Sequence, residues 1–178
     1  DDSISTGMRK DLELALDKIE SSVKRARRIT HQLLSFARSA DTMTKEFNLS
    51  ELAVEVVELT RKTAAECQAE VSAACEVKDM RIWSDPYQVR QVLLNLVSNG
   101  LQAVAPGGMV EIIITGNEKD AIAVVRDNGP GIPPENLARI FEPFFTTKPP
   151  GEGTGLGLSV SRGIIEKLGG QIQVDSKL

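Results

Sequence analysis

The sequence predicts an α/β fold preceded by one long helix. Along residues 12–37, apolar residues recur in alternating steps of four and three, which is typical of a helix with one buried seam. After residue 47, amphipathic helical stretches alternate with short apolar runs of strand length, of which residues 121–125 are the clearest. A chain of 178 residues can hold one hydrophobic core and one additional element.

The composition is that of an ordinary globular protein and disfavours several kinds of partner. The chain is 41% hydrophobic and 26% charged, and its net charge of -4 gives no general attraction to nucleic acid or to an anionic membrane. No apolar run approaches the roughly 20 residues that a membrane helix needs. Cys67 and Cys75 have no metal-ligand companions, which favours reduced thiols and a cytoplasmic location.

The predicted long helix lies within residues 1–40; its seam begins at Leu12 and extends over more than three heptads. At about 45 Å for roughly 30 residues, it is too long to bury that seam against one small domain. We therefore expect the seam to pack against a second copy of the chain in a homodimer, or against a helix that this chain lacks. The seam residues are Leu12, Leu16, Ile19, Val23, Ala26, Thr30, Leu33 and Ala37.

His31 is the only histidine, and it follows seam position Thr30. It could be a phosphoacceptor or a general base, or simply a solvated residue on the flank of a helix bundle. Neither neighbour is acidic, whereas a reactive imidazole usually has an orienting carboxylate. We favour the solvated residue.

Residues 41–46 interrupt the helical pattern and are predicted to link the long helix to a second unit over residues 47–178. Ser50 is the expected N-cap of an amphipathic helix that ends at about Cys67. Two strands should follow, over residues 71–77 and 80–83.

Asp85 and Pro86 form a typical helix start, with Asp as the cap and Pro in the first turn. The helix that follows carries Asn95 and Asn99 one turn apart within an apolar run. A single asparagine there would most often be a satisfied core residue, but two at this spacing suggest a polar face toward a ligand. An amide oxygen can bind Mg²⁺.

Asp127 to Gly131 follows residues 121–125, which are predicted to form a strand buried on both faces. The stretch Asp-Asn-Gly-Pro-Gly is either an ordinary turn or a carboxylate acceptor beside bare backbone that a ligand can approach. By itself this stretch favours the turn.

A glycine-rich segment precedes the last predicted helix, residues 156–168. Backbone amides before a helix N-terminus make an anion site. Neither a P-loop nor a dinucleotide fingerprint is present. Residues 142–155 are predicted to form a lid that is mobile until phosphate binds. The chain's last residues are expected to form an unfinished strand.

Four stretches resemble the N, G1, F and G2 boxes of sensor histidine kinases, in the family's order and at its spacing. They are Asn95-x-x-x-Asn99, Asp127-x-Gly129-x-Gly131, residues 141–145, and Gly153-Thr154-Gly155-Leu156-Gly157-Leu158. The resemblance covers roughly residues 45–175. It implies a Bergerat-type two-layer α/β sandwich, with a mixed sheet and helices on one face, that binds ATP and Mg²⁺.

The resemblance also implies roles for single residues. Asp127 would accept a hydrogen bond from the adenine amino group, with Gly129 and Gly131 beside the base. Asn99 would ligate Mg²⁺, and Asn95 would support the phosphate end as the second catalytic residue. The ATP-binding residues implied in the lid and after it are Thr147, Lys148, Gly153, Thr154, Gly155, Leu156, Gly157 and Leu158. One departure from the family is Gly100, where Ala is usual.

The first helix resembles the second helix of the family's dimerisation and phosphotransfer hairpin. The family's phosphorylated histidine is followed by an acidic residue and then by Asn or Thr and Pro, a pattern that residues 32–36 after His31 lack. We therefore expect the acceptor helix, and the family's closing strand after Leu178, to be missing from this chain. Residues 47–178 would be a catalytic domain that binds ATP but does not phosphorylate residues 1–40.

The implied reaction transfers the γ-phosphoryl group of ATP to a histidine on the hairpin, and then to an aspartate in the receiver domain of a response regulator. No nucleic-acid or membrane contact by this chain is implied, although a longer parent could be anchored at the inner face of the cell membrane. One alternative is an ATPase of the same superfamily, but those enzymes place Glu where Asn95 stands, and Asn cannot activate water as a base. The other is a non-catalytic nucleotide-sensing dimerisation module, which the intact boxes disfavour.

Overall fold

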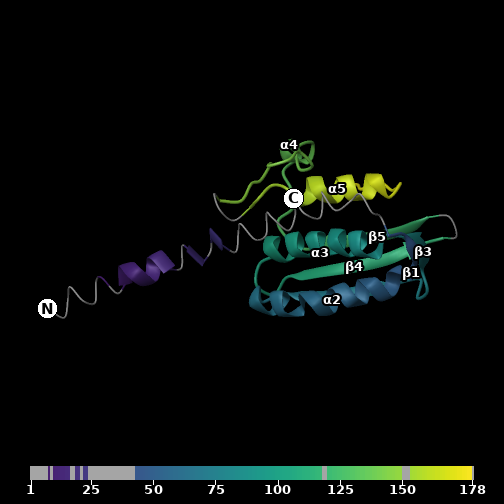
Figure 1. Ribbon diagram of the computed structural model, residues 1–178, viewed down its shortest axis with the longest axis horizontal. Coiled ribbons are helices and arrows are strands. Elements are labelled where there is room, and N and C mark those ends of the chain that lie inside the picture. The colour runs from purple at the N-terminus through teal and green to yellow at the C-terminus, as the bar shows by residue number, and fades with distance from the viewer. Residues whose placement is uncertain are drawn as a thin grey trace.

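A mixed sheet with helices packed on one face forms the frame of the domain (Figure 1). In the computed structural model, the described residues are 8, 10–16, 19–20, 22–23, 43–117, 120–149 and 153–177. Strands β2 (Glu70–Cys75), β4 (Met109–Gly116) and β5 (Ala121–Asp127) pair in the order β2-β4-β5. β2 runs parallel to β4, and β5 runs antiparallel to it. This mixed sheet confirms the predicted α/β fold class.

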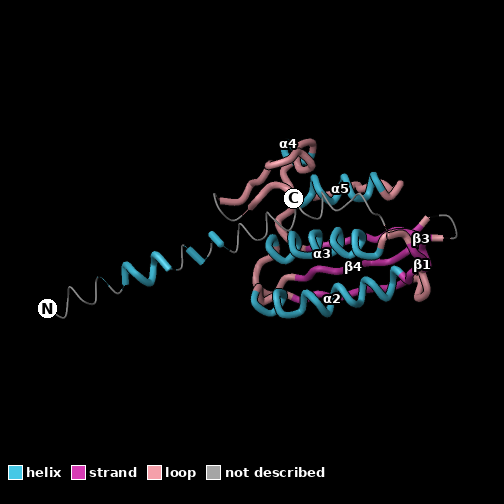
Figure 2. Tube along the Cα trace, in the orientation of Figure 1, coloured by secondary structure: helices cyan, strands magenta, loops and turns pink. Residues whose placement is uncertain are grey.

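A second, two-stranded sheet lies at one end of the domain (Figure 2). It pairs β1 (Lys45–Asn48) with β3 (Arg81–Ser84) in antiparallel register, with Phe47 opposite Ile82. β1 begins at Lys45, so the last two residues of the predicted linker lie in a strand. The predicted strand over residues 71–77 is observed as β2, shifted toward the N-terminus at both ends.

The core lies between the three-stranded sheet and helices α2 (Leu49–Glu66) and α3 (Pro86–Ala103). Ile112 and Ile114 of β4 are fully buried, as are Val56 of α2 and Val97 of α3. Both helices are amphipathic: their apolar faces pack on the sheet, and their polar positions point away from it. α4 (Pro134–Leu137) is a single turn, and α5 (Gly157–Lys167) packs against α3.

The helix starts follow the predicted chemistry at α3 and depart from it at α2. Asp85 caps α3 by accepting hydrogen bonds from the backbone N–H groups of Tyr87 and Gln88, and Pro86 is in the first turn, as predicted. The prediction of Ser50 as the cap of α2 was wrong. Asn48 caps it instead, because the Ser50 hydroxyl is buried and donates to the carbonyl oxygen of Val77 at 2.6 Å.

Strand β5 corrects a second prediction, that of a strand buried on both faces. Residues 121–124 are exposed, and within the part of the chain that the structure describes no strand pairs with the outer edge of β5. Residues 171–177, predicted as an unfinished strand, have no regular structure. The apolar residues of β5 border a large cavity, so an apolar run can mark a cavity wall as well as a buried strand.

The described part of the long N-terminal helix has an exposed seam. Residues 10–16 are helical, and the seam residues Leu12, Leu16, Ile19 and Val23 are all more than half exposed. The rest of the predicted helix, including His31, lies outside the described residues. No helix among those described is both long and apolar enough to cross a membrane.

We predict that replacing Ile112 with Ala lowers the free energy of unfolding by about 2–5 kcal/mol, because it leaves a cavity at a fully buried position of β4. Ile122→Ala in β5 is the matched control: Ile122 is 48% exposed, so its loss should cost less than about 1 kcal/mol. Denaturant unfolding followed by circular dichroism measures both values. Equal losses in the two variants would contradict this description of the core.

Candidate functional site

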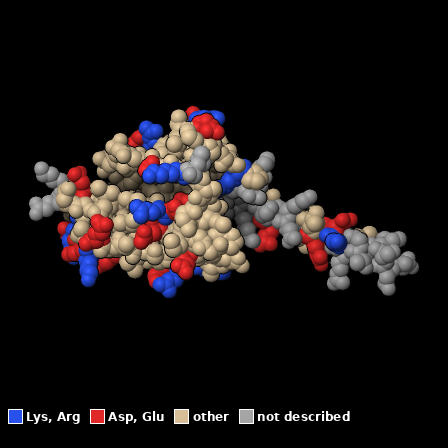
Figure 3. Space-filling view, turned by 180° about the vertical axis from the view of Figure 1, so that it is seen from behind, with Lys and Arg blue, Asp and Glu red and all other residues tan. Residues whose placement is uncertain are grey.

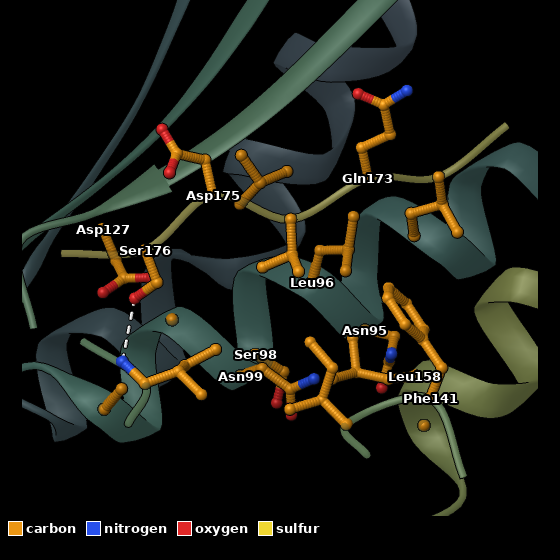
Figure 4. A pocket seen from close by; sticks show the side chains of 18 of the residues that line it. Asn95, Leu96, Ser98, Asn99, Asp127, Phe141, Leu158, Gln173, Asp175 and Ser176 are labelled. Carbon is orange, nitrogen blue, oxygen red and sulfur yellow. Dashed lines mark hydrogen bonds between the residues drawn. The ribbon is translucent and has the colours of Figure 1, made fainter. Parts of the chain in front are cut away.

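Helix α3 forms the floor of a cavity that is also lined by β5 and the segment after it, by residues of the predicted lid, by the start of α5 and by residues 169–177. Asn95 and Asn99 lie on the side of α3 that faces this cavity (Figure 4). In this view Asn99 lies between Asn95, beside Phe141 and Leu158, and Asp127, beside Ser176. Three polar groups of the predicted site therefore follow one another in a row along α3. Asn95 and Asn99 belong to the helix, and Asp127 belongs to the end of β5.

Asn95 is at the end of this row that contacts α5. Its Nδ2 donates to the Oγ of Ser161 at 2.9 Å, and Ser161 is only 2% exposed. Gly157, the first residue of α5, packs directly on the amide of Asn95, so a Cβ at position 157 would collide with Oδ1. Any larger residue at position 157 would displace the Asn95 amide from this position.

Asn99, one turn further along α3, is half-buried. Within the described residues its side chain makes no hydrogen bond, so its amide is available to a ligand. On the neighbouring edge of α3, the Nε2 of Gln102 donates to the Oγ of Ser98 at 3.2 Å. The Nζ of Lys148 in the lid donates to the Oε1 of the same Gln102.

Asp127 is at the other end of the row, at the end of β5. Its Oδ1 accepts a hydrogen bond from the backbone N–H of Gly129 at 2.9 Å. No hydrogen bond to its Oδ2 forms within the described part of the chain. The carboxylate is thus held by the turn that follows it, and one oxygen remains able to accept from a ligand.

The loop after Asp127 is tied to residues near the end of the chain. The Oγ of Ser176 accepts from the backbone N–H of Ile132 at 2.8 Å (Figure 4). Gly131 has a φ of +78°, and a Cβ there would collide with the carbonyl oxygen of Lys177. Only glycine suits this position, because both its backbone conformation and the space around it exclude a side chain.

The lid is joined at its base. The backbone N–H of Phe144 donates to the carbonyl oxygen of Gly155 at 2.9 Å. Between these residues, Thr146 contacts Gly153 closely and its hydroxyl accepts from the backbone N–H of Lys148.

The side of the molecule opposite to that in Figure 1 is hollowed, and Lys and Arg side chains lie beside the hollow (Figure 3).

The lid leads directly into the N-terminus of α5, which has 11 residues. The residue at its N-cap position, Leu156, makes no side-chain hydrogen bond to the first turn. Free backbone N–H groups and the helix dipole together favour an anion at such a terminus. This end of the cavity, next to Asn95, is therefore the one suited to phosphate.

The structure brings together around one cavity all of the site residues predicted from the sequence except Leu156, whose position does not border it. Those that do border it are Asn95, Asn99, Asp127, Gly129, Gly131, Thr147, Lys148, Gly153, Thr154, Gly155, Gly157 and Leu158. Sequence reasoning missed Ser98, Gln102, Thr146, Ser161 and Ser176. Single hydroxyl and amide residues have no local pattern that could have indicated them.

The cavity has a volume of about 1920 Å³, larger than the roughly 300–1,000 Å³ of ordinary ligand pockets. Besides α3 and the predicted lid, the cavity is lined by the exposed face of β5 and by residues 169–177, which accounts for its size. No group of three or more His, Cys, Asp or Glu side chains that could hold a metal ion occurs among the described residues. The amide oxygens of α3 are instead suited to a hard cation that takes its other ligands from water and phosphate.

Comparison with known proteins identifies the family. Residues 84–178 match the family described as histidine kinase-, DNA gyrase B- and HSP90-like ATPase. Sporulation kinase A of Bacillus subtilis is 39% identical over 161 residues, which are 90% of this chain and 26% of that protein. Sensor histidine kinase ZraS of Salmonella typhimurium is 34% identical over 153 residues, 85% of this chain and 32% of that protein. The chain thus spans between a quarter and a third of the length of these relatives.

Solved structures give the same family. The nucleotide-free catalytic domain of histidine kinase ThkA has a TM-score of 0.64 and 38% identity, and the match covers 70% of this chain and 81% of that one. Histidine kinase ThkA in complex with response regulator protein TrrA has a TM-score of 0.69 and 32% identity, covering 84% of this chain and 42% of that one. The chain belongs to the histidine kinase-, DNA gyrase B- and HSP90-like ATPases, and it contains the ATP-binding catalytic domain of a sensor histidine kinase.

Proposed function

We propose that this chain is the catalytic part of a protein that transfers the γ-phosphoryl group of ATP to a histidine, for relay to an aspartate of a response regulator. The observation that carries the proposal is the row of polar groups along α3, with a carboxylate at one end and an uncapped helix N-terminus at the other. Such a row suits a molecule with a hydrogen-bonding base at one end and phosphates at the other.

In this proposal the adenine lies beside Asp127. The carboxylate is fixed through Oδ1 by the N–H of Gly129, so Oδ2 accepts from the adenine amino group. Gly129 and Gly131 border the same cavity, so the base lies beside their backbone. The phosphates extend along α3 toward the start of α5, where Gly153, Gly155 and Gly157 approach them.

Mg²⁺ is assigned to Asn99. Its amide oxygen faces the cavity and has no partner among the described residues, as a ligand to a hard cation requires. When bound, the ion neutralises charge on the phosphates. The protein positions the γ-phosphoryl group for attack by an imidazole nitrogen, with ADP as the leaving group. Because the attacking nitrogen is already a good nucleophile, the protein accelerates the reaction mainly by positioning the two reacting groups.

The environment of Asn95 disfavours the rival ATPase function. Hydrolysis by the related ATPases uses a carboxylate base at this position, and Asn95 carries an amide that donates to Ser161. A non-catalytic nucleotide-sensing module stays the second candidate, since it would use the same cavity. It differs from the proposed kinase in one respect: it would transfer no phosphate to a supplied hairpin.

The proposed partners follow from the chain's first part and from its relatives. We assign residues 1–40 to the second helix of a dimerisation hairpin, 41–46 to a linker and 47–178 to the catalytic domain. The exposed seam of Leu12, Leu16, Ile19 and Val23 supports a homodimer. ThkA, a relative, has been solved with a response regulator, which supports a receiver domain as the second partner. We also propose a cytoplasmic location, because the proposed reaction consumes ATP and passes the phosphoryl group to a response regulator.

We predict that Asp127→Asn weakens ATP binding by about 10- to 100-fold, because a hydrogen bond to a charged group is worth about 1.5–3 kcal/mol. The ratio of ATP affinity to GTP affinity should also fall, because guanine carries an oxygen where adenine carries the amino group that Asp127 accepts from. Titration calorimetry measures both. Glu135→Gln in α4 is the matched control, because it removes the same charge from a residue that does not border the cavity. Unchanged affinity in Asp127→Asn would contradict the adenine assignment.

We predict that Gln102→Ala makes Lys148 about two- to fivefold more reactive toward an amine-directed reagent, since contacts near the surface are worth at most about 1 kcal/mol. The variant removes the acceptor through which α3 holds this lid residue. Mass spectrometry of the nucleotide-free protein quantifies modification of Lys148. Gln91→Ala, also on α3, should leave that reactivity as in the wild type. Equal reactivity in all three proteins would show that Gln102 does not hold the lid.

We predict that, with γ-labelled ATP and Mg²⁺, label reaches a separately supplied acceptor hairpin and not this chain. Asn99→Ala should abolish transfer, because the metal ligand is lost. His31→Ala should change nothing. Label on the chain itself that disappears in His31→Ala would refute the assignment of His31 as a solvated residue. ATP binding without any transfer to the hairpin would favour the non-catalytic module.

A further inference from the structure

The two asparagines of α3 differ in how their amides are held. Asn95 donates from Nδ2 to the buried hydroxyl of Ser161 at 2.9 Å. Asn99 makes no side-chain hydrogen bond within the described residues. One amide is therefore fixed before any ligand arrives, and the other can turn toward the ligand.

While Nδ2 of Asn95 donates to Ser161, Oδ1 is the atom of the amide that faces the start of α5. A Cβ built on Gly157 would collide with Oδ1 of Asn95, whereas Nδ2 lies further away, at 3.0 Å. Gly157 and Ser161 are one turn apart on the same face of α5. One face of α5 thus binds the nitrogen of the amide and leaves the oxygen directed toward its own N-terminus.

We propose that Ser161 is a positioning residue, which fixes the Asn95 amide so that its oxygen faces the phosphate end of the cavity. This inference rests on the proposed function. An amide oxygen is a hydrogen-bond acceptor and a cation ligand, and it repels phosphate oxygens. In this orientation the oxygen of Asn95 would help to hold Mg²⁺ near the phosphates, and the amide would not donate directly to a phosphate. Without Ser161 the amide can turn and present Nδ2 instead.

The plainer explanation of the same hydrogen bond is a simple tie, by which we mean a structural contact that only holds α3 and α5 together. It would make Ser161 matter for stability and for every ligand equally. The positioning role makes a narrower claim, because it affects only steps that depend on the orientation of Asn95. Residues that orient a metal ligand typically alter metal affinity or activity by about 10- to 100-fold when replaced.

The first test needs no nucleotide. In NMR spectra of the 178-residue chain, the side-chain N–H protons of Asn95 should exchange with solvent faster in Ser161→Ala than in the wild type. Ser159→Ala is the matched control, because its hydroxyl donates to the carbonyl oxygen of Leu156 and does not border the cavity. Exchange that is unchanged in Ser161→Ala would overturn the proposal whether or not the protein is a kinase.

The second test separates metal from nucleotide. Ser161→Ala should raise the Mg²⁺ concentration needed for half-maximal ATP binding by about tenfold, and it should leave binding of ADP in the presence of a chelator unchanged. Ser161→Thr, which keeps the hydroxyl, should restore the wild-type Mg²⁺ requirement. Equal weakening of both nucleotides, or no recovery in Ser161→Thr, would favour the simple tie. Should Ser161→Ala fail to fold, Ser161→Cys provides a weaker acceptor of similar size.

The third test asks whether Ser161 acts through Asn95. In the Asn95→Ala background, adding Ser161→Ala should cause no further rise in the Mg²⁺ requirement. A further rise of the same size would show an independent role and overturn the proposal. A wild-type chain that binds no ATP at all would refute the proposed function, while the exchange measurement would still decide the orientation of Asn95.

Discussion

The packing of α3 on β4 is the constraint on which the rest of the structure depends. Val97 and Leu101 are buried against the sheet. In an α-helix, residues two positions apart point in nearly opposite directions, so this packing directs Asn95 and Asn99 away from the core. The lid, α5 and the loop after β5 then gather on that polar face. One apolar contact surface therefore decides where the cavity lies and what lines its floor.

Local signals in the sequence were enough for the elements whose ends are determined by their own residues. Asp85 and Pro86 specify the start of α3, and the predicted last helix matches α5 to within one residue at each end. The cap of α2 could not be predicted, since Asn48 and Ser50 are both good caps. The choice depends on Val77, 27 residues away from Ser50. The prediction that β5 is buried on both faces was wrong, because an apolar run in the sequence does not show which elements cover its two faces.

The same division holds for the candidate site. Its glycines and asparagines could be found because they recur at fixed spacings within short stretches. Ser161, Gln102 and Ser176 could not, because their partners lie 66, 46 and 44 residues away along the chain. Each is an ordinary polar residue until the fold brings its partner near. Sequence motifs indicate the groups that would touch a ligand, and the residues that hold those groups in place become visible only in three dimensions.

The hydrogen bond between Phe144 and Gly155 has an evolutionary consequence. Because it joins Phe144 to Gly155, the two points at which the predicted lid leaves and re-enters the fold are held together by backbone groups. The cost of closing a loop grows only slowly with its length. Insertions between these two points can therefore accumulate at little cost to the rest of the fold, provided that the residues facing the cavity and the contact of Thr146 with Gly153 are kept. Related proteins could vary their lids to suit different partners while the cavity floor stays the same.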